Sequence, residues 1–185
     1  MIRSLLSRLD RHSPSERGHA ERVAVYAVAT GEALGLNDES LLELRYAALL
    51  HDVGKISIDA QLLGKIGRLT EEEMDALRLH AMIAASVIEA FDWLQPCIPS
   101  IRHHHERWDG GGYPDGLAGA EIPLGARIIN LAETFDVILM GLHGAPRSDE
   151  TAIAEIRRCS ESQFDPQVVE AFLRVQPLIQ PISEG

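Results

Sequence analysis

Apolar side chains recur along most of the chain at the three- and four-residue spacing of amphipathic helices. The first apolar stripe consists of Ile2, Leu5, Leu6 and Leu9. It predicts a short N-terminal amphipathic helix over residues 1–12, followed by one domain over residues 13–185. No segment has the strict apolar and polar alternation of a half-buried strand, so the pattern predicts an all-α bundle.

Capping residues indicate where the helices begin and end. Ser13, Pro14 and Glu16 are a predicted N-cap, first-turn proline and capping-box glutamate of a helix that Gly35 closes. Further helices are expected over residues 38–50, from Thr70 with its capping partner Glu73, over 122–142, over 149–159, and from Asp165-Pro166 onward. Residues 109–116 are rich in glycine and proline and predict a loop.

Length and composition agree with one helical domain. The chain has 185 residues, of which 45% are hydrophobic, enough to fill a core. It contains no run of about 18 apolar residues, so we expect neither a membrane span nor a signal peptide and predict a cytoplasmic protein without a membrane partner. Cys97 and Cys159 are too few for a disulfide framework and are expected to be small buried hydrophobic residues.

The charge balance limits the class of ligand. A net charge of −11 argues against binding a nucleic-acid polymer, because phosphate backbones are held by clustered Lys and Arg. A smaller anionic substrate would need a local source of positive charge. Bound divalent metals supply such charge, and the eight histidines are the place to look for their ligands.

The adjacent pair His51-Asp52 places a nitrogen and an oxygen ligand at the end of an apolar helix, where Gly54 is expected to let the chain turn away. The Asp52 carboxylate has two oxygens and is able to bridge two metals. A capping aspartate beside a helix-terminal histidine is the alternative interpretation of the pair taken alone.

Further histidines lie on other helices. His19 is on an earlier helix, His80 is on the apolar stripe of a later one, and His104-His105 are in tandem. A lone histidine on an apolar face is more often a core residue than a ligand. Several inward-facing imidazoles without partners would be costly to bury, so shared metals account for them better.

Two segments carry a family resemblance. HHERWDGGGYP at residues 104–114 resembles the HHExxDGxGYP signature of HD-GYP domains, and HDVGK at residues 51–55 resembles their HDxGK motif. Similarity runs from His19 to QFDP at residues 163–166, so it covers nearly the whole chain. It implies an HD-domain helical bundle with the HD-GYP C-terminal extension, and hydrolysis of cyclic di-GMP to the linear dinucleotide or to GMP.

The resemblance also implies a di-metal site, with iron or manganese as the expected ions and nickel or zinc as alternatives. One metal would be held by His19, His51 and Asp52. Asp52 would bridge to a second metal held by His80, His104 and His105. Asp52 and Lys55 are the expected catalytic residues, and Lys55 would donate to phosphate oxygens; an ordinary solvated lysine is the alternative.

Candidate substrate contacts follow the tandem histidines. Asp109, Gly112 and Tyr113 lie in the glycine-rich loop, where Tyr113 or backbone amides would meet a guanine or a phosphate. A structural turn with Tyr113 packed beneath it is an equal alternative. Arg127 is a further candidate phosphate contact, with an ion pair at the surface as its alternative.

The chain departs from the family pattern at three places. Glu133 occupies the position where the family has an aspartate metal ligand, and Asp136 is the reserve candidate. Leu142-His143-Gly144-Ala145 replaces an Arg-Pro-Tyr-Arg stretch, so that loop is expected to be altered. Ser15 stands where some relatives carry a glutamate ligand to a third metal, so two metals are expected. His12, His103 and His143 have no motif role and are expected at the surface or behind the ligands.

Three functions remain open. The first is an active cyclic di-GMP phosphodiesterase, and the second is a degenerate domain that binds nucleotide or metal and signals through a protein partner. The third is a phosphohydrolase acting on another nucleotide, because a fold does not fix a substrate. The stripe over residues 1–12 serves either a partner or homodimer contact or docking on its own domain.

Overall fold

The computed structural model describes residues 2–14, 18–65, 67–141 and 145–179; in this part of the chain the regular structure consists of helices joined by turns and loops, without a β-sheet. The longer helices are α1 (Ile2–His12), α2 (His19–Ala33), α3 (Asp38–Leu50), α5 (Glu71–Ile88), α7 (Leu124–Met140), α8 (Asp149–Arg158) and α9 (Pro166–Val175). The short ones are η2 (Val53–Ser57), α4 (Ala60–Leu63), η3 (Asp92–Cys97), α6 (Ile98–Arg102), η4 (Gly119–Glu121) and η5 (Gln176–Leu178). The predicted all-α class is confirmed.

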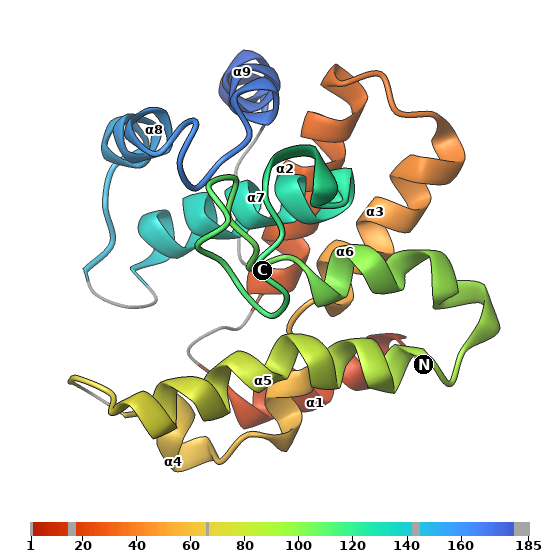
Figure 1. Cartoon of the computed structure of the whole chain (residues 1–185), viewed down its shortest axis with the longest axis vertical. Helices are drawn as coiled ribbons and strands as arrows, with labels where there is room; N and C mark the ends of the chain where they lie inside the picture. Colours follow the sequence, from red (N-terminus) through yellow and green to blue (C-terminus); the bar gives the residue numbers. More distant parts are fainter. Residues whose placement is uncertain (1, 15–17, 66, 142–144, 180–185) are drawn as a thin grey trace.

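Helix α2 is the centre of the packing and contacts α3, α7 and α9. Figure 1 shows α8 and α9 at one end of the molecule, α1, α4 and α5 at the other, and α7 running between them. Apolar faces of α2, α3, α5, α7 and α9 form a single core in which Phe135, Phe164 and Phe172 are fully buried. The burial of one face per helix follows the 3.6-residue spacing of the sequence.

The N-terminal helix α1 docks on its own domain. Leu9 is buried, and Ile2 and Leu5 pack against the core. Helix α1 contacts η2 and α3, and the His12 ring donates from Nε2 to the carbonyl oxygen of Ile58 over 2.7 Å. The described contacts show that the apolar stripe of α1 docks on its own domain. A contact of this stripe with a partner or with a second copy of the chain stays a prediction.

The predicted start of the second helix is wrong. Helix α2 begins at His19, and its N-cap is Gly18, whose φ of 72° favours glycine. Ser13 instead extends the end of α1, because its backbone N–H donates to the Leu9 carbonyl oxygen. Glu16, which carried part of that prediction, lies outside the described residues, and so does Ser15, the position at which some relatives carry a ligand to a third metal.

Other predicted helix ends are confirmed by their caps. The Thr70 hydroxyl accepts from the Glu73 N–H while the Glu73 carboxylate accepts from the Thr70 N–H, which completes the capping box of α5. Asp165 accepts from the Gln167 N–H at the start of α9. Helix α7 is shorter than the predicted 122–142 at both ends, because Pro123 is its N-cap and Gly141, at φ 65°, terminates it.

Gly54 has a different role from the predicted one. Its φ is not positive, but a Cβ at this position would collide with the carbonyl oxygen of His80. The residue is needed because η2 and α5 approach closely there. Glycine at residue 54 therefore brings the His51-Asp52 pair next to the helix that carries His80.

None of the helices within the described ranges is long and apolar enough to cross a membrane. Cys97 and Cys159 are buried and carry free thiols, as predicted.

Candidate metal centre

The seven predicted metal ligands come from five parts of the chain and meet at one place. The ligands are His19 at the start of α2, His51 and Asp52 between α3 and η2, His80 on α5, His104 and His105 after α6, and Glu133 on α7. Their donor atoms form overlapping groups of three, each lying within 4.8 Å. The groups are His80 with His104 and His105, His19 with His51 and Glu133, and His51 with Asp52 and His104.

Asp52 lies at the junction of these groups and is 1% exposed. Its Oδ1 is 3.4 Å from His80 Nε2, and its Oδ2 is 3.3 Å from His51 Nε2 and 3.9 Å from His19 Nε2. Lys55 Nζ donates to Oδ2 over 2.8 Å. One carboxylate thus presents one oxygen toward each side of the cluster, as a bridging ligand would.

The imidazoles are oriented by hydrogen bonds on their far sides. Nδ1 of His51 lies 2.7 Å from the carbonyl oxygen of Ala48, and Nδ1 of His80 lies 2.6 Å from that of Leu77. His104 Nδ1 lies 2.6 Å from the oxygen of Ile101. Since a carbonyl oxygen only accepts, each Nδ1 carries a hydrogen, and in its neutral form each ring directs the Nε2 lone pair into the site. Burial lowers the pKa of His51, but the neighbouring Asp52 carboxylate outweighs burial and raises this pKa to about 9, so a bound cation would have to displace the Nε2 proton of His51.

The Nε2 atoms of His80 and His104 are closer together than two uncharged acceptors favour, at 3.3 Å. Both rings carry their hydrogen on Nδ1, so the facing Nε2 lone pairs repel, and a cation between them would remove the repulsion. His105 Nε2 lies 3.0 Å from His80 Nε2, within hydrogen-bond distance. Burial lowers the pKa of His80 and holds the pKa values of His104 and His105 well below the usual range, and in each case it is the largest cause. The low pKa values favour the neutral form of these rings, which is the form that binds a metal.

Asp136 supports His19 and does not occupy a ligand position. His19 Nδ1 donates to Asp136 Oδ2 over 2.7 Å, and Arg22 donates to both carboxylate oxygens over 2.7 and 3.1 Å. The prediction of Asp136 as reserve ligand is therefore corrected, because Asp136 bonds Nδ1 of His19, on the side of the ring away from the Nε2 atom that approaches Asp52. Sequence reasoning missed Arg22, although it lies three residues after His19 on the same helix.

Glu133 reaches the centre despite its extra methylene. Its Oε2 is 4.0 Å from His105 Nδ1, and its side chain is 14% exposed. Burial is the largest cause that raises its pKa, which a nearby cation would reverse. The structure thus places the glutamate beside His19 and His51, where the pattern required a carboxylate.

Asn130 is a further buried residue that the sequence did not reveal. Its amide donates over 2.7 Å to the carbonyl oxygen of His104 and over 3.3 Å to that of Glu106. These bonds fix the backbone on both sides of His105. No motif or spacing marks this asparagine, because its role depends on α7 crossing behind the tandem histidines.

The glycine-rich loop covers the cluster on one side. The Tyr113 ring stacks on His105 at a centroid distance of 4.8 Å, and Arg78 lies over the Tyr113 ring. A Cβ on Gly112 would collide with the backbone N of Arg107, so this glycine is required by the chain's own close approach. Asp109 pairs with Arg107 over 2.6 Å and accepts from the Gly111 N–H. These contacts favour the structural interpretation of the turn over the ligand interpretation.

Arg127 has structural partners. Its guanidinium pairs with Asp165 at 2.5 Å, donates to the carbonyl oxygen of Ile122, and lies over the Trp108 ring. The structure therefore has the alternative that was predicted for Arg127, namely an ion pair. This ion pair is partly buried and links α7 to the start of α9. We therefore do not retain Arg127 as a phosphate contact.

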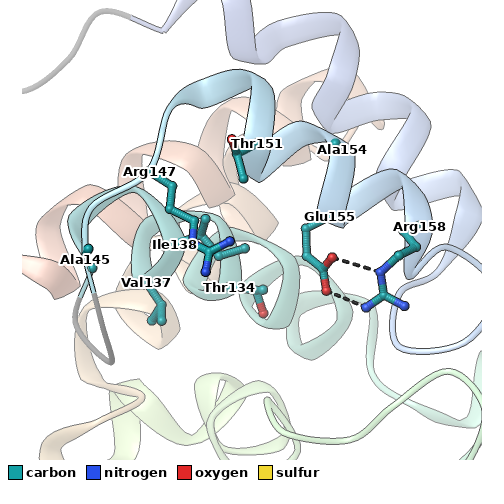
Figure 2. A pocket seen from close by; sticks show the side chains of 10 residues that line it. Thr134, Val137, Ile138, Ala145, Arg147, Thr151, Ala154, Glu155 and Arg158 are labelled. Carbon is teal, nitrogen blue, oxygen red and sulfur yellow. Dashed lines mark hydrogen bonds and ion pairs between the residues drawn. The ribbon is translucent and has the colours of Figure 1, made fainter.

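A cavity of about 610 Å³ lies apart from the histidine cluster, between α7 and α8 (Figure 2). Arg147 points into it, and the ion pair of Glu155 with Arg158 stands at its edge. Within the described part of the chain, its lining includes none of the predicted metal ligands. Leu142, His143 and Gly144 of the predicted altered loop lie outside the described residues.

Comparisons with known proteins identify the family. The family model described as "HD domain" matches residues 4–168. A "Cyclic di-GMP phosphodiesterase" of Thermotoga maritima is 37% identical over 161 residues, which are 85% of this chain and 44% of that protein. The "Cyclic di-GMP phosphodiesterase response regulator RpfG" of Xanthomonas campestris is 36% identical over 97% of this chain and 50% of that protein. The chain thus spans about half the length of these relatives.

A solved structure has the same fold. The "cyclic GMP-AMP" specific phosphodiesterase V-cGAP3 of Vibrio cholerae superposes with a TM-score of 0.75 at 24% identity, over 95% of this chain and 48% of that one. Since the family match extends over most of the sequence, and the HD and GYP motifs lie inside it, the chain belongs to the HD domain family, as its HD-GYP resemblance predicted.

Proposed function

We propose that the chain is a metal-dependent phosphodiesterase that hydrolyses a cyclic dinucleotide, with cyclic di-GMP as the substrate. The observation that carries the proposal is the approach of the Nε2 lone pairs of His80 and His104 beside the Asp52 carboxylate. Facing lone pairs beside a carboxylate repel one another unless a cation binds between them. The names of the two curated relatives, both cyclic di-GMP phosphodiesterases, support the substrate.

The proposed ligand sets follow the groups of donor atoms. His19, His51, Asp52 and Glu133 would hold one ion, and Asp52, His80, His104 and His105 would hold the other. Mixed imidazole and carboxylate ligands suit iron or manganese, with nickel or zinc as alternatives. When bound, a pair of divalent ions supplies positive charge for a phosphate and activates water near neutral pH.

The chain's own groups orient the ligands and the substrate. Carbonyl oxygens and Asp136 fix the tautomers of His19, His51, His80 and His104, so these rings require little rearrangement on binding. The Lys55 ammonium is 15% exposed beside Asp52, and we propose that it donates to a non-bridging phosphate oxygen. Local cations of this kind would also offset the chain's net charge of −11 when an anionic dinucleotide approaches.

The test is hydrolysis of cyclic di-GMP by protein prepared anaerobically with manganese or ferrous iron. Products are separated by chromatography, and metal content is determined on the same sample. The proposal expects two metals per chain and turnover to the linear dinucleotide or GMP that stops on chelation. Two bound metals without any product would favour the degenerate binding module and overturn the proposed activity.

A second candidate substrate comes from the structural neighbour, whose name includes cyclic GMP-AMP. Parallel reactions with 3',3'-cyclic GMP-AMP at equal concentration distinguish the two. A kcat/KM that is higher for cyclic GMP-AMP would replace the proposed substrate while leaving the di-metal chemistry in place, because substrate choice depends on contacts to the bases.

A further inference from the structure

A second group of potential metal ligands lies beside the tandem histidines but outside the set described above. It consists of His103, Glu106 and Asp115, which we call the outer cluster, and one donor atom of each lies within 4.8 Å of the others. His103 and Glu106 flank His104-His105 in the sequence, and Asp115 lies near the end of the glycine-rich loop. No motif of the sequence assigns these three residues a shared role.

Two polar atoms of the outer cluster are buried without a hydrogen-bond partner in the described part of the chain: His103 Nδ1 and Glu106 Oε2. Glu106 is 2% exposed, and its Oε1 accepts from the backbone N–H groups of Asp115 and Gly116 over 2.7 and 3.0 Å. A buried carboxylate is stable when a cation or several donors compensate it. The two amides supply only part of that compensation.

The spacing of the donor atoms distinguishes a direct ion pair from an ion site. His103 Nδ1 is 3.7 Å from Glu106 Oε1 and 3.6 Å from Asp115 Oδ2. Both distances exceed the roughly 3.2 Å limit of a good hydrogen bond. Two ligands that each lie about 2.1 Å from a tetrahedral ion are about 3.4 Å apart. The spacing therefore fits a shared ion better than a protonated imidazole bonded to a carboxylate.

We propose that the outer cluster binds one divalent transition-metal ion of the zinc class through His103, Glu106 and Asp115. One nitrogen and two carboxylate oxygens form a ligand set that zinc accepts, with water as the fourth ligand. Arg102 donates to both oxygens of Asp115 over 3.1 and 3.0 Å, which fixes the orientation of this more exposed carboxylate. Each carboxylate oxygen has a second lone pair, and Oδ2 lies 3.6 Å from His103 Nδ1, so Asp115 is able to ligate an ion while it accepts from Arg102.

The position of this ion gives it a structural role. Glu106 precedes the glycine-rich loop and Asp115 ends it, so one ion would tie the two ends of the loop to His103 after α6. That loop stacks Tyr113 on His105. The ion would therefore hold the cover of the candidate metal centre in place without taking part in the chemistry.

The test is the zinc content of purified protein after equilibration with zinc and removal of excess, measured without substrate. Wild-type protein should retain one more zinc ion per chain than His103→Gln or Asp115→Asn. The matched control is Asp75→Asn, which also removes an aspartate from an exposed pair with arginine, at 2.9 Å from Arg78, but at no metal cluster. Equal zinc content in all four proteins would overturn the proposal.

Two features keep this test independent of the proposed activity and of folding defects. In a His80→Ala background, which weakens the central site, Asp115→Asn should still remove one zinc ion; no further loss would also overturn the proposal. Circular dichroism verifies folding, and Asp115→Asn carries the test if His103→Gln does not fold, because Asp115 is 40% exposed at its side chain.

Discussion

The central site around Asp52 and the outer cluster share one short segment, residues 103–106, but they differ in how their imidazoles are held. In the central site, His51, His80 and His104 are each fixed by a carbonyl oxygen through Nδ1. In the outer cluster, His103 Nδ1 has no hydrogen-bond partner among the described residues. The comparison indicates a centre whose imidazoles are oriented before any ion binds and, beside it, a proposed ligand group whose imidazole has no such hydrogen bond.

The largest expected effect comes from removing the bridging carboxylate. Asp52→Ala should lose activity to below detection and lose metal from the central site, because both proposed ions share this ligand. Metal analysis and hydrolysis on the same sample provide the measurement. The outer cluster should keep its single zinc ion, which separates the two sites. Full activity in a metal-free Asp52→Ala protein would contradict the di-metal account.

Lys55→Ala should lower kcat by about 100-fold, because it removes one donor to the developing phosphate charge. Metal content should stay unchanged, since Lys55 is not a ligand. Lys65→Ala is the control, because Lys65 pairs at the surface with Glu73 and should leave kcat unchanged. An equal loss of metal and of rate in Lys55→Ala would instead assign Lys55 to holding Asp52.

Asp136→Asn should weaken metal affinity at the central site by about 10- to 100-fold, because the residue orients His19 without ligating. Competition with a chelator measures the affinity. Asp165→Asn is a matched control, since Asp165 is also a buried partner of an arginine but lies away from the cluster. If both variants retain wild-type affinity, His19 does not depend on Asp136 for its orientation.

The smallest expected effect concerns the loop between the two sites. Tyr113→Ala should lower the free energy of unfolding by about 1 to 2 kcal/mol, through loss of the ring contact with His105. Tyr113→Phe should keep stability and KM, because the ring is what packs. Urea denaturation and steady-state kinetics test the pair. A raised KM in Tyr113→Phe alone would restore the interpretation of Tyr113 as a substrate contact.

Helical periodicity and capping residues were sufficient to predict most of the fold. Thr70 with Glu73 and Asp165 with Pro166 mark helix starts that the structure confirms. The prediction of Ser13 as a helix N-cap was wrong, because a serine followed by a proline has the same local sequence at the end of one helix as at the start of the next. Tertiary packing, and not local preference, decides between the two.

The predicted ligands meet in the structure because they are all tied to motifs or to inward-facing helical positions. Residues that act behind them were not predictable in the same way. Asn130 is positioned by the crossing of α7 behind the histidines, and Arg22 pairs with Asp136, 114 residues later. Such long-range partners leave no periodic trace in the sequence.

The most direct test of the central claim is anomalous X-ray diffraction from crystals grown anaerobically with manganese, recorded above and below the manganese edge. The account predicts two anomalous peaks, one on each side of the Asp52 carboxylate, within about 2.0–2.3 Å of its oxygens and of the surrounding histidine Nε2 atoms. A site without manganese peaks at Asp52, in crystals where the histidines are ordered, would contradict it.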